Sequence, residues 1–535
     1  MAEDEATDTD ERDDTKLRTA RKLFEESCDH HAKAHAEAHR AQQFFHNTEC
    51  EGQWDPADVA YLREQSRHVL SFNIVKPKIE TMMGMYADAQ RRPVVSSSSA
   101  KTKLLADVVE IVKEQVLQDA RYERKSARQF RTGVISGESA LQVEVVPSSK
   151  GKGWIQVNLH RVMPFELHWD PGSIEPDRSD ARHVFWDRWF SKSEFVREYP
   201  DQAPEFDSLV KRGGVGDYSA SAELGEMGMD ISDTRDDYRD DGKTQYYADR
   251  RKNQIRVIRY EYKEWAPAWF VTDEITGQRS EIDEEQATNV EMAMQMGLPV
   301  SVEKTDVERV RVCEFIGSTL LAEYDEAGPF DGFSIVPFTY MIDEETGTAY
   351  GFVRNLFDPQ QELNKSKSLE IEYIAQATAP GTTAEKDAIP DEDQFRAESR
   401  RAGGVAIVAK GALTEGRVQA RVPPTPSPAV MARAAGAHEM FTEISGIAST
   451  GMTSPAEQAQ AGMTVAIRYH KSRQTVQDPF SNFEDCQREV VRRVVESITR
   501  SMPDDQIVAI LGSEDRYVVQ GGMLIEVEEG PQGQK

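Results

Sequence analysis

The sequence has 535 residues, 39% of them apolar, which suits roughly three or four packed domains. Lys and Arg total 64 against 93 Asp and Glu, a formal net charge of −29. This balance excludes a protein that coats DNA through a general basic surface, because such a surface must neutralise phosphates. The four cysteines are scattered without paired spacing, which fits a reducing compartment and no disulfide framework.

The first quarter of the chain predicts helices. Residues 1–14 hold eight acidic residues and one basic residue, which is typical of a solvated tail. Helical runs are expected over 15–48, 56–90 and 100–132, the last with one apolar face. Pro77 predicts a kink in the second run, because proline removes an intrahelical hydrogen bond.

The middle of the chain predicts strands. Residues 141–145 and 154–157 alternate between apolar and polar side chains, the period of a half-buried strand. A Gly-, Ser- and Asp-rich stretch, 213–245, predicts a mobile surface loop, and 281–296 predicts a short helix. Further strands are expected at 254–265, 268–272, 307–316 and 334–340.

The clearest local signal is a helix start at Asp358, where an N-cap acid is followed by Pro359 and by Gln361. This helix is expected to end near Ala377, before a Pro-Gly pair. Further elements are expected in the order of a short strand at 405–409, a proline-rich stop at 423–428, a helix over 430–447, a small-residue loop at 448–462, a long helix at 463–500 interrupted at Pro479, and a β-like stretch at 516–529.

Histidines at i, i+4 and i+8 share one face of the first helix: His31, His35 and His39. Such spacing suits a transition metal. A zinc site normally adds ligands from a second element, and no such ligands are apparent in the sequence. A polar or interfacial helix face is therefore favoured over a metal site.

Acidic residues at 343–345 suggest either a two-metal nuclease site or a solvated turn. The turn is favoured because Gly347 follows at once and no His or Lys is adjacent. No phosphate-binding P-loop, G-x-S-x-G, H-E-x-x-H or C-x-x-C motif occurs, so an ATP-driven motor is unsupported. No cofactor is expected.

Basic residues recur in the second half of the chain and suit contacts with a phosphate backbone. For each of them, helix solvation or an ion pair with Glu362, Glu370 or a neighbouring subunit is the favoured alternative. The residues are Lys365, Lys367, Arg468, Lys471 and Arg473.

Four stretches in a fixed order carry a family resemblance. They are Phe44-Phe45 with Gly52-Gln53-Trp54, residues 71–80 and Gln90-Arg91-Arg92-Pro93; His168-Trp169-Asp170-Pro171 followed by residues 177–182; Ile335-Val336-Pro337-Phe338 with residues 350–356; and residues 443–447 followed, after the small-residue loop, by residues 462–467. Over roughly residues 40–500 this order resembles the portal proteins of tailed bacteriophages, closest to the short-tailed podovirus type.

The resemblance implies an α+β portal fold that forms rings. It implies a mixed α/β wing, a two-helix stem, a small α/β clip and a long helix leading to a short crown. The implied domains are an acidic tail and N-terminal helix at 1–40, wing 41–345, first stem helix 346–377, clip 378–428, second stem helix 429–447, tunnel loop 448–462, and long wing helix with short crown 463–535.

The implied function is a dodecameric ring at one capsid vertex, through which double-stranded DNA is packaged and ejected. The implied partners are the terminase motor, the major capsid and scaffolding proteins and a tail adaptor protein, with no membrane and no enzymatic activity. The protein is expected in the virion after assembly in the host cytoplasm. The alternatives are another head–tail adaptor or a metal-dependent DNA-processing enzyme.

The resemblance also implies where functional residues lie. Lys410, Arg417 and Arg421 are candidates for partner contacts in the clip. The candidates for the DNA channel are Lys365, Lys367, Ser449, Thr450, Met452, Glu457, Gln458, Gln460, Arg468 and Lys471.

Overall fold

The chain folds into two units, and each unit takes its residues from separate stretches of sequence. Unit 1 holds residues 1–39, 89–351 and 477–535, and unit 2 holds residues 40–88 and 352–476. The computed structural model describes residues 2–47, 52–65, 67–89, 92–96, 103–213, 247–249, 252–273, 279–282, 290, 300–378, 381–401, 405–421, 428–447, 474, 477–511, 517–520 and 523–526. No helix within these ranges is long and apolar enough to cross a membrane.

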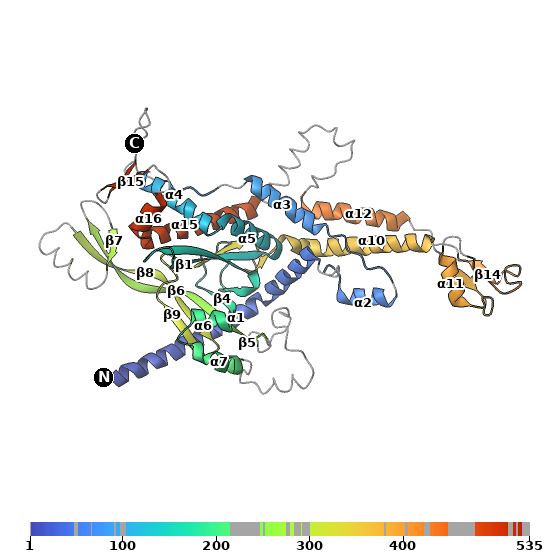
Figure 1. Ribbon diagram of the computed structural model, residues 1–535, viewed down its shortest axis with the longest axis horizontal. Helices are drawn as coiled ribbons and strands as arrows, with labels where there is room; N and C mark the ends of the chain where they lie inside the picture. Colours follow the sequence, from blue (N-terminus) through green and yellow to red (C-terminus); the bar gives the residue numbers. More distant parts are fainter. Residues whose placement is uncertain are drawn as a thin grey trace, which may run out of the picture. The chain divides into compact units, whose positions relative to one another are not determined.

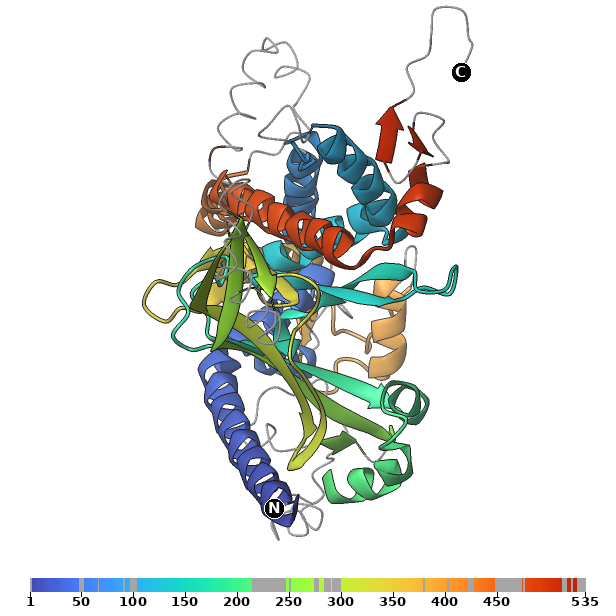
Figure 2. The same cartoon turned by 90° about the vertical axis from the view of Figure 1, so that its left-hand side faces the viewer.

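Unit 1 is built on two antiparallel sheets (Figures 1 and 2). The smaller sheet has the order β10-β1-β2, and the larger one the order β3-β4-β6-β8-β9, with β5 and β7 also paired to β6. The strands are β1 (Glu138–Pro147), β2 (Ile155–Val162), β3 (Leu167–Trp169), β4 (His183–Ser191), β5 (Ala248–Asp249), β6 (Gln254–Asp273), β7 (Arg279–Ile282), β8 (Val300–Ile316), β9 (Thr319–Tyr324) and β10 (Ile335–Thr339).

Most of the predicted strands are present, but the expected break between 265 and 268 is wrong. β6 runs through Pro267, which pairs with Asp306 of β8. Proline is tolerated on an edge because it has no amide to donate. On the other side of β6, β4 pairs up to Tyr262 and β7 only from Trp269, so Pro267 faces no described strand there.

Helices cover the smaller sheet with an aromatic core. Phe130 of α5 lies 4.9 Å from Phe483 of α15, and Phe483 lies 4.7 Å from Phe338 of β10, between ring centroids. Gln487 of α15 also donates to Ser126 of α5 at 3.1 Å. The helices of this unit are α4 (Lys103–Asp119), α5 (Tyr122–Ser136), α6 (Lys192–Glu198), α7 (Phe206–Gly213), α15 (Gln477–Ser501), α16 (Asp504–Leu511), and the 3-10 turns η3 (Pro164–Glu166) and η4 (Ala203–Glu205).

Several helix predictions are wrong in their bounds. α1 (Ala2–His46) begins at Ala2, so the acidic run is helical where a solvated tail was expected; acids in a first turn suit the helix dipole. The single run predicted over 100–132 is broken at Arg121, whose φ of 55° is left-handed. Pro479 lies in the first turn of α15, where proline fits without kinking a helix.

Three further predictions for this unit concern a short helix, a surface loop and a C-terminal β stretch. Glu281 belongs to strand β7, not to a helix, and the rest of the predicted helix 281–296 lies almost wholly outside the described residues, as does the predicted loop 213–245. The predicted C-terminal β stretch is confirmed as a hairpin. Its strands are β15 (Tyr517–Gln520) and β16 (Met523–Glu526).

Unit 2 is dominated by two helices that lie side by side and run in opposite directions, α10 (Phe357–Thr378) and α12 (Pro428–Ser445) (Figure 1). Both were predicted; α10 starts one residue before Asp358 and follows a 3-10 turn, η6 (Phe352–Leu356). The remaining elements are α2 (Pro56–Glu64), α3 (Val75–Ala89), β13 (Thr382–Ala384), α11 (Glu392–Arg400) and β14 (Val418–Ala420).

The expected long helix 56–90 is instead two helices separated by an extended stretch, residues 67–74. Pro77 lies in the first turn of α3 and does not kink it. Between α10 and α12, the expected strand 405–409 is wrong. Val405 and Ile407 are exposed and pair with no described strand, and the strand pair of this region is β13 with β14.

Candidate functional site

The extended stretch 67–74 runs along α10 and is held by polar side chains from successive turns of that helix. Four residues of helix rise about 6 Å and two extended residues rise almost the same, so one helix turn matches every second residue of the stretch. The pairs are Gln360 with the Ile74 amide (3.3 Å) and the Phe72 carbonyl (2.8 Å), Asn364 with the Phe72 amide (2.8 Å), and Ser368 with the Leu70 amide (3.3 Å). We call Gln360, Asn364 and Ser368 the polar ladder.

The polar ladder is buried and its hydrogen bonds are linked. Asn364 donates to Gln53 at 3.1 Å and accepts from Gln360 at 3.0 Å. Gln53 in turn donates to the Phe44 carbonyl at 2.8 Å. Because buried amides are costly when unpaired, these linked bonds fix one register between the stretch and α10.

Ion pairs extend the same arrangement toward α12. Arg433 of α12 binds Glu362 of α10 through two hydrogen bonds, at 2.6 and 3.0 Å. These bonds hold the pKa of Glu362 below its ordinary value. Arg67 forms a further pair with Glu372 at 2.5 Å, one turn beyond the polar ladder.

The end of α12 is fixed from α3. The buried Lys78 of α3 donates a short hydrogen bond to the carbonyl of Ile447, just past the helix end. Burial lowers the pKa of Lys78. The amine thus satisfies a buried backbone carbonyl of the residues that follow α12.

The outer surfaces of the helix pair and the connecting segment carry apolar side chains. Met440 is 56% exposed and Ile444 is 45% exposed, one turn apart on α12. In the segment between α10 and α12, Val405, Ile407 and Leu413 are also exposed. Such surfaces on adjacent elements are typical of protein contact sites.

The two channel candidates on α10 are both paired within the unit. Lys365 lies 2.6 Å from Asp58 of α2, a partner that sequence reasoning missed, and Lys367 lies 2.9 Å from Glu370. Both lysines are partly exposed, and pairs of this kind contribute little to stability. Because these ion pairs are weak, the ammonium group of either lysine can pair with a phosphate in place of the carboxylate.

The clip candidates lie in the segment between α10 and α12. Arg417 pairs with Glu415 at 2.8 Å, while Lys410 and Arg421 are exposed and form no ion pair with any described residue. The other channel candidates lie outside the described residues. These are Ser449, Thr450, Met452, Glu457, Gln458, Gln460, Arg468 and Lys471, and Arg473 lies outside as well.

His31 and His35 form a buried seam in unit 1 between α1 and the larger sheet, whereas His39 is half-buried. His31 faces the Trp169 carbonyl at 3.2 Å, and the His35 ring stands 5.0 Å from that of His168. Burial and neighbouring positive charge lower the pKa of His31 well below its ordinary value and that of His35 to about 3. Burial disfavours the charged form of His168 too, but Cys28 and Asp187 raise its pKa to about 9.

This seam does not have the geometry of a metal site: among the described residues, no group of three or more His, Cys, Asp or Glu side chains is placed to hold an ion. The acidic residues 343–345 form the turn between β11 (Met341–Ile342) and β12 (Ala349–Tyr350), where the Glu345 amide donates to Asp343 at 3.2 Å. The solvated-turn interpretation fits this geometry.

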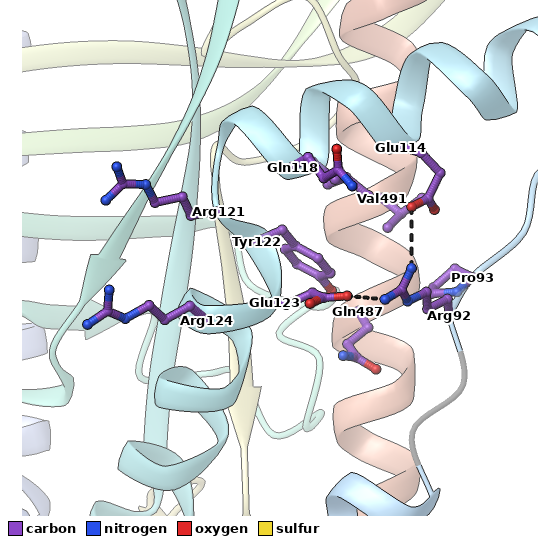
Figure 3. A pocket seen from close by; sticks show the side chains of 11 residues that line it. Arg92, Pro93, Glu114, Gln118, Arg121, Tyr122, Glu123, Arg124, Gln487 and Val491 are labelled. Carbon is purple, nitrogen blue, oxygen red and sulfur yellow. Dashed lines mark hydrogen bonds and ion pairs between the residues drawn. The ribbon is translucent and has the colours of Figure 1, made fainter. Parts of the chain in front are cut away.

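A cavity of about 350 Å³ opens in unit 1 between α4, α5 and α15. Figure 3 shows Arg92 at its wall, bridging Glu114 (3.6 Å) and Glu123. Arg121 and Arg124 extend away from these carboxylates, on the other side of the start of α5. Of the three arginines that line the cavity, Arg92 is thus paired with carboxylates, whereas Arg121 and Arg124 form no ion pair with a described residue.

Sequence reasoning missed the polar ladder and the basic residues of α5. The ladder is visible as Gln, Asn and Ser at i, i+4 and i+8 of a helix whose apolar face is modest. Its partner stretch gives no such signal, because its contacts are made by backbone amides and carbonyls.

Comparison with protein families identifies the class. Residues 21–533 match the family described as phage P22-like portal protein. A comparison with curated protein sequences finds no match. The matched residues include nearly all of both units. The family is one of bacteriophage portal proteins, which are the head–tail connectors of virions. The chain belongs to the phage P22-like portal protein family.

Proposed function

We propose that the chain is the subunit of a closed ring of about twelve copies at one capsid vertex, through which double-stranded DNA enters and leaves. The family match carries this proposal. The helix pair α10–α12 supports it, because one subunit leaves Met440 and Ile444 exposed on a surface that a neighbouring copy can cover. We assign the two helices to the stem of this ring.

In this ring, DNA can slide because the channel binds its phosphates only weakly. The net charge of −29 per subunit repels phosphates, and a few basic side chains position the duplex without clamping it. We place Lys365, Lys367, Arg468 and Lys471 among these basic side chains. The remaining channel candidates, which are polar, acidic or apolar, are Ser449, Thr450, Met452, Glu457, Gln458 and Gln460. The tunnel-loop assignment of 448–462 remains part of this proposal.

The proposed partners follow the same division. The segment between α10 and α12, with Lys410, Arg417 and Arg421, is assigned to tail and adaptor contacts. The terminase motor docks on the ring during packaging, and the major capsid and scaffolding proteins surround it as the head assembles in the host cytoplasm. No catalytic role is assigned to any residue.

The test is assembly of the purified chain, followed by native mass spectrometry and electron microscopy. The wild-type chain is expected to form rings of about twelve subunits with a central hole. The double variant Met440→Glu, Ile444→Glu is expected to shift toward monomers, because charges cannot be buried unpaired at an interface. The control Glu439→Ala, Glu443→Ala changes exposed neighbours on the same helix and should keep the ring.

A wild-type chain that remains monomeric at micromolar concentration would contradict the proposal. For the channel, deletion of residues 453–460 should leave rings intact and lower the DNA retained in filled heads. Wild-type yields from such heads would remove the tunnel-loop assignment while leaving the ring in place.

A further inference from the structure

One face of α5 carries a row of basic side chains. Arg121 directly precedes the helix, and the four that follow it lie on α5 itself. A helix of 3.6 residues per turn gathers these four within an arc of about 120° over roughly 10 Å. We call this row the α5 basic face: Arg121, Arg124, Lys125, Arg128 and Arg131.

Four of the five cations of this face have no ion-pair partner among the described residues. Within the described part of the chain, Arg121, Arg124, Lys125 and Arg128 form no ion pair, although Asp and Glu outnumber Lys and Arg by 93 to 64 in the whole sequence. The one acid of this stretch, Glu123, turns the other way to Arg92 (Figure 3).

The cations also repel one another. Burial, and then the charge of Arg121, lowers the pKa of Lys125. Burial and Arg128 likewise lower the pKa of Arg161, an exposed residue of the neighbouring strand β2. A row of like charges that raises its own electrostatic energy is relieved when an anionic partner binds.

The first residue of the face has a costly backbone. Arg121 adopts φ 55° and ψ 42°, a left-handed conformation that favours glycine or asparagine. Arginine at such a position gives up local stability, which is typical of a residue retained for a contact.

The chain itself offers a matching anion. Residues 3–14 contain eight acids and one arginine, and they lie in the helical start of α1. Acids at positions 4, 8, 11 and 14 repeat at the same three- and four-residue spacing as the basic row, and both sets span eleven residues. Figures 1 and 2 both show the start of α1 apart from α5, so a second copy must supply the segment.

We propose that the α5 basic face binds the acidic segment 3–14 of a second copy of this chain, as a charge-complementary contact between subunits. The proposal rests on the ring proposed above. Subunits that each carry a net charge of −29 repel one another. Local contacts between opposite charges would offset this repulsion at the subunit interfaces of the ring.

A charge-swap experiment on the full-length chain tests the contact. The variants are Arg124→Glu with Arg128→Glu, Asp8→Lys with Glu11→Lys, and all four changes together. At about 50 mM salt, mass photometry across a concentration series should show each double variant assembling at about ten-fold higher concentration than wild type. The fourfold variant should assemble within about three-fold of wild type, because the pairs are restored with reversed sign.

The matched control is Lys152→Glu with Arg197→Glu, which makes the same charge change at exposed residues outside α5 and should assemble as wild type. Circular dichroism and thermal melting should be unchanged for Arg124→Glu with Arg128→Glu, since both side chains are exposed. About 500 mM salt should erase the difference between variants and wild type.

Three results would overturn the inference. The first is wild-type assembly of the Arg124→Glu, Arg128→Glu variant. The second is a fourfold variant that remains impaired. The third is a variant that keeps its rings and loses affinity for a labelled DNA duplex, which would make the face a nucleic-acid site. Wild-type chain that never forms rings would overturn the proposed function and this inference together, whereas the three results above leave the ring standing.

Discussion

The histidine seam shows how one residue type takes two charge states in one core. His35 and His31 are held neutral by burial, while His168, between Cys28 and Asp187, is held charged. Asp187 is itself tied to Arg256 by an ion pair at 2.5 Å. The face that α1 turns to the sheet therefore combines neutral imidazoles with a fixed pattern of charge.

This pattern predicts a pH dependence with two arms. The pKa of His35 is about 3 in the folded protein and about 6.5 in the unfolded chain. The unfolded state therefore gains a proton first, and the stability that neutral His35 contributes is lost as pH falls below about 6.5. His168 has a raised pKa of about 9, so its contribution is present below about 6.5 and is lost as pH rises toward 9. Unit 1 should be most stable near neutrality.

The acid arm is tested with His35→Gln, which keeps a hydrogen-bond donor and removes the titration. Between pH 7 and 5, thermal unfolding of the wild type should lose about 2 kcal/mol more stability than the variant. His68→Gln is the control, because this exposed imidazole makes no side-chain hydrogen bond or ion pair with a described residue, and the variant should follow the wild type. Equal pH slopes for wild type and His35→Gln would show that His35 already titrates normally.

At the scale of elements, the polar ladder shows that α10 is positioned by hydrogen bonds as much as by apolar packing. Gln360 and Asn364 have no exposed surface, and each makes several bonds to backbone or to one another. A ladder of this kind permits one register only, since a shift by one residue would leave buried amides unpaired.

Replacing Asn364 by leucine tests the ladder. The change leaves the Phe72 amide and the Gln53 carbonyl oxygen without their partner, at a cost of about 3 kcal/mol. Hydrogen exchange should accelerate in residues 67–74. Gln361→Leu, three residues before Asn364 on the same helix and outside the polar ladder, should leave exchange there unchanged. Protection of 67–74 in the Asn364 variant would refute the ladder's role.

The elements also show where sequence reasoning succeeds. The starts of α10 and α12 lie within two residues of the predicted positions, because acids, prolines and apolar spacing act within a few residues and can be read locally. Asp358 itself lies in the first turn of α10, not at the predicted N-cap. The extended stretch 67–74 was predicted as helix, because its conformation depends on side chains of α10 nearly 300 positions away. The left-handed Arg121 had no local signal either, since arginine rarely adopts that conformation.

The candidate site divides in the same way. The basic residues of α10 are recognisable by type and spacing, and Lys367 forms an ion pair with Glu370, a partner expected from the sequence. The partner of Lys365 comes from α2, which no spacing rule connects with α10. The basic face of α5 is hard to predict because its arginines lie within a run whose strongest signal is its apolar periodicity.

At the scale of the whole molecule, unit 1 needs the last long helix of the chain. α15 supplies Phe483 to the core around Phe130 and Phe338, and Asn482 donates to the Thr339 carbonyl at 3.2 Å. A chain cut after residue 476 should therefore expose this core and aggregate or bind a hydrophobic dye. A chain cut after residue 511 keeps α15 and α16 and should remain soluble; equal solubility of the two would show that α15 is dispensable.

The interleaved arrangement of the two units has a consequence for synthesis. A ribosome makes residues in order, so the core around Phe130 stays incomplete until the much later helix α15 has been synthesised. Until then, the aromatic side chains that α15 covers remain exposed in the nascent chain. Unit 1 therefore cannot finish folding as its first sheet emerges, unlike a domain encoded by one continuous stretch.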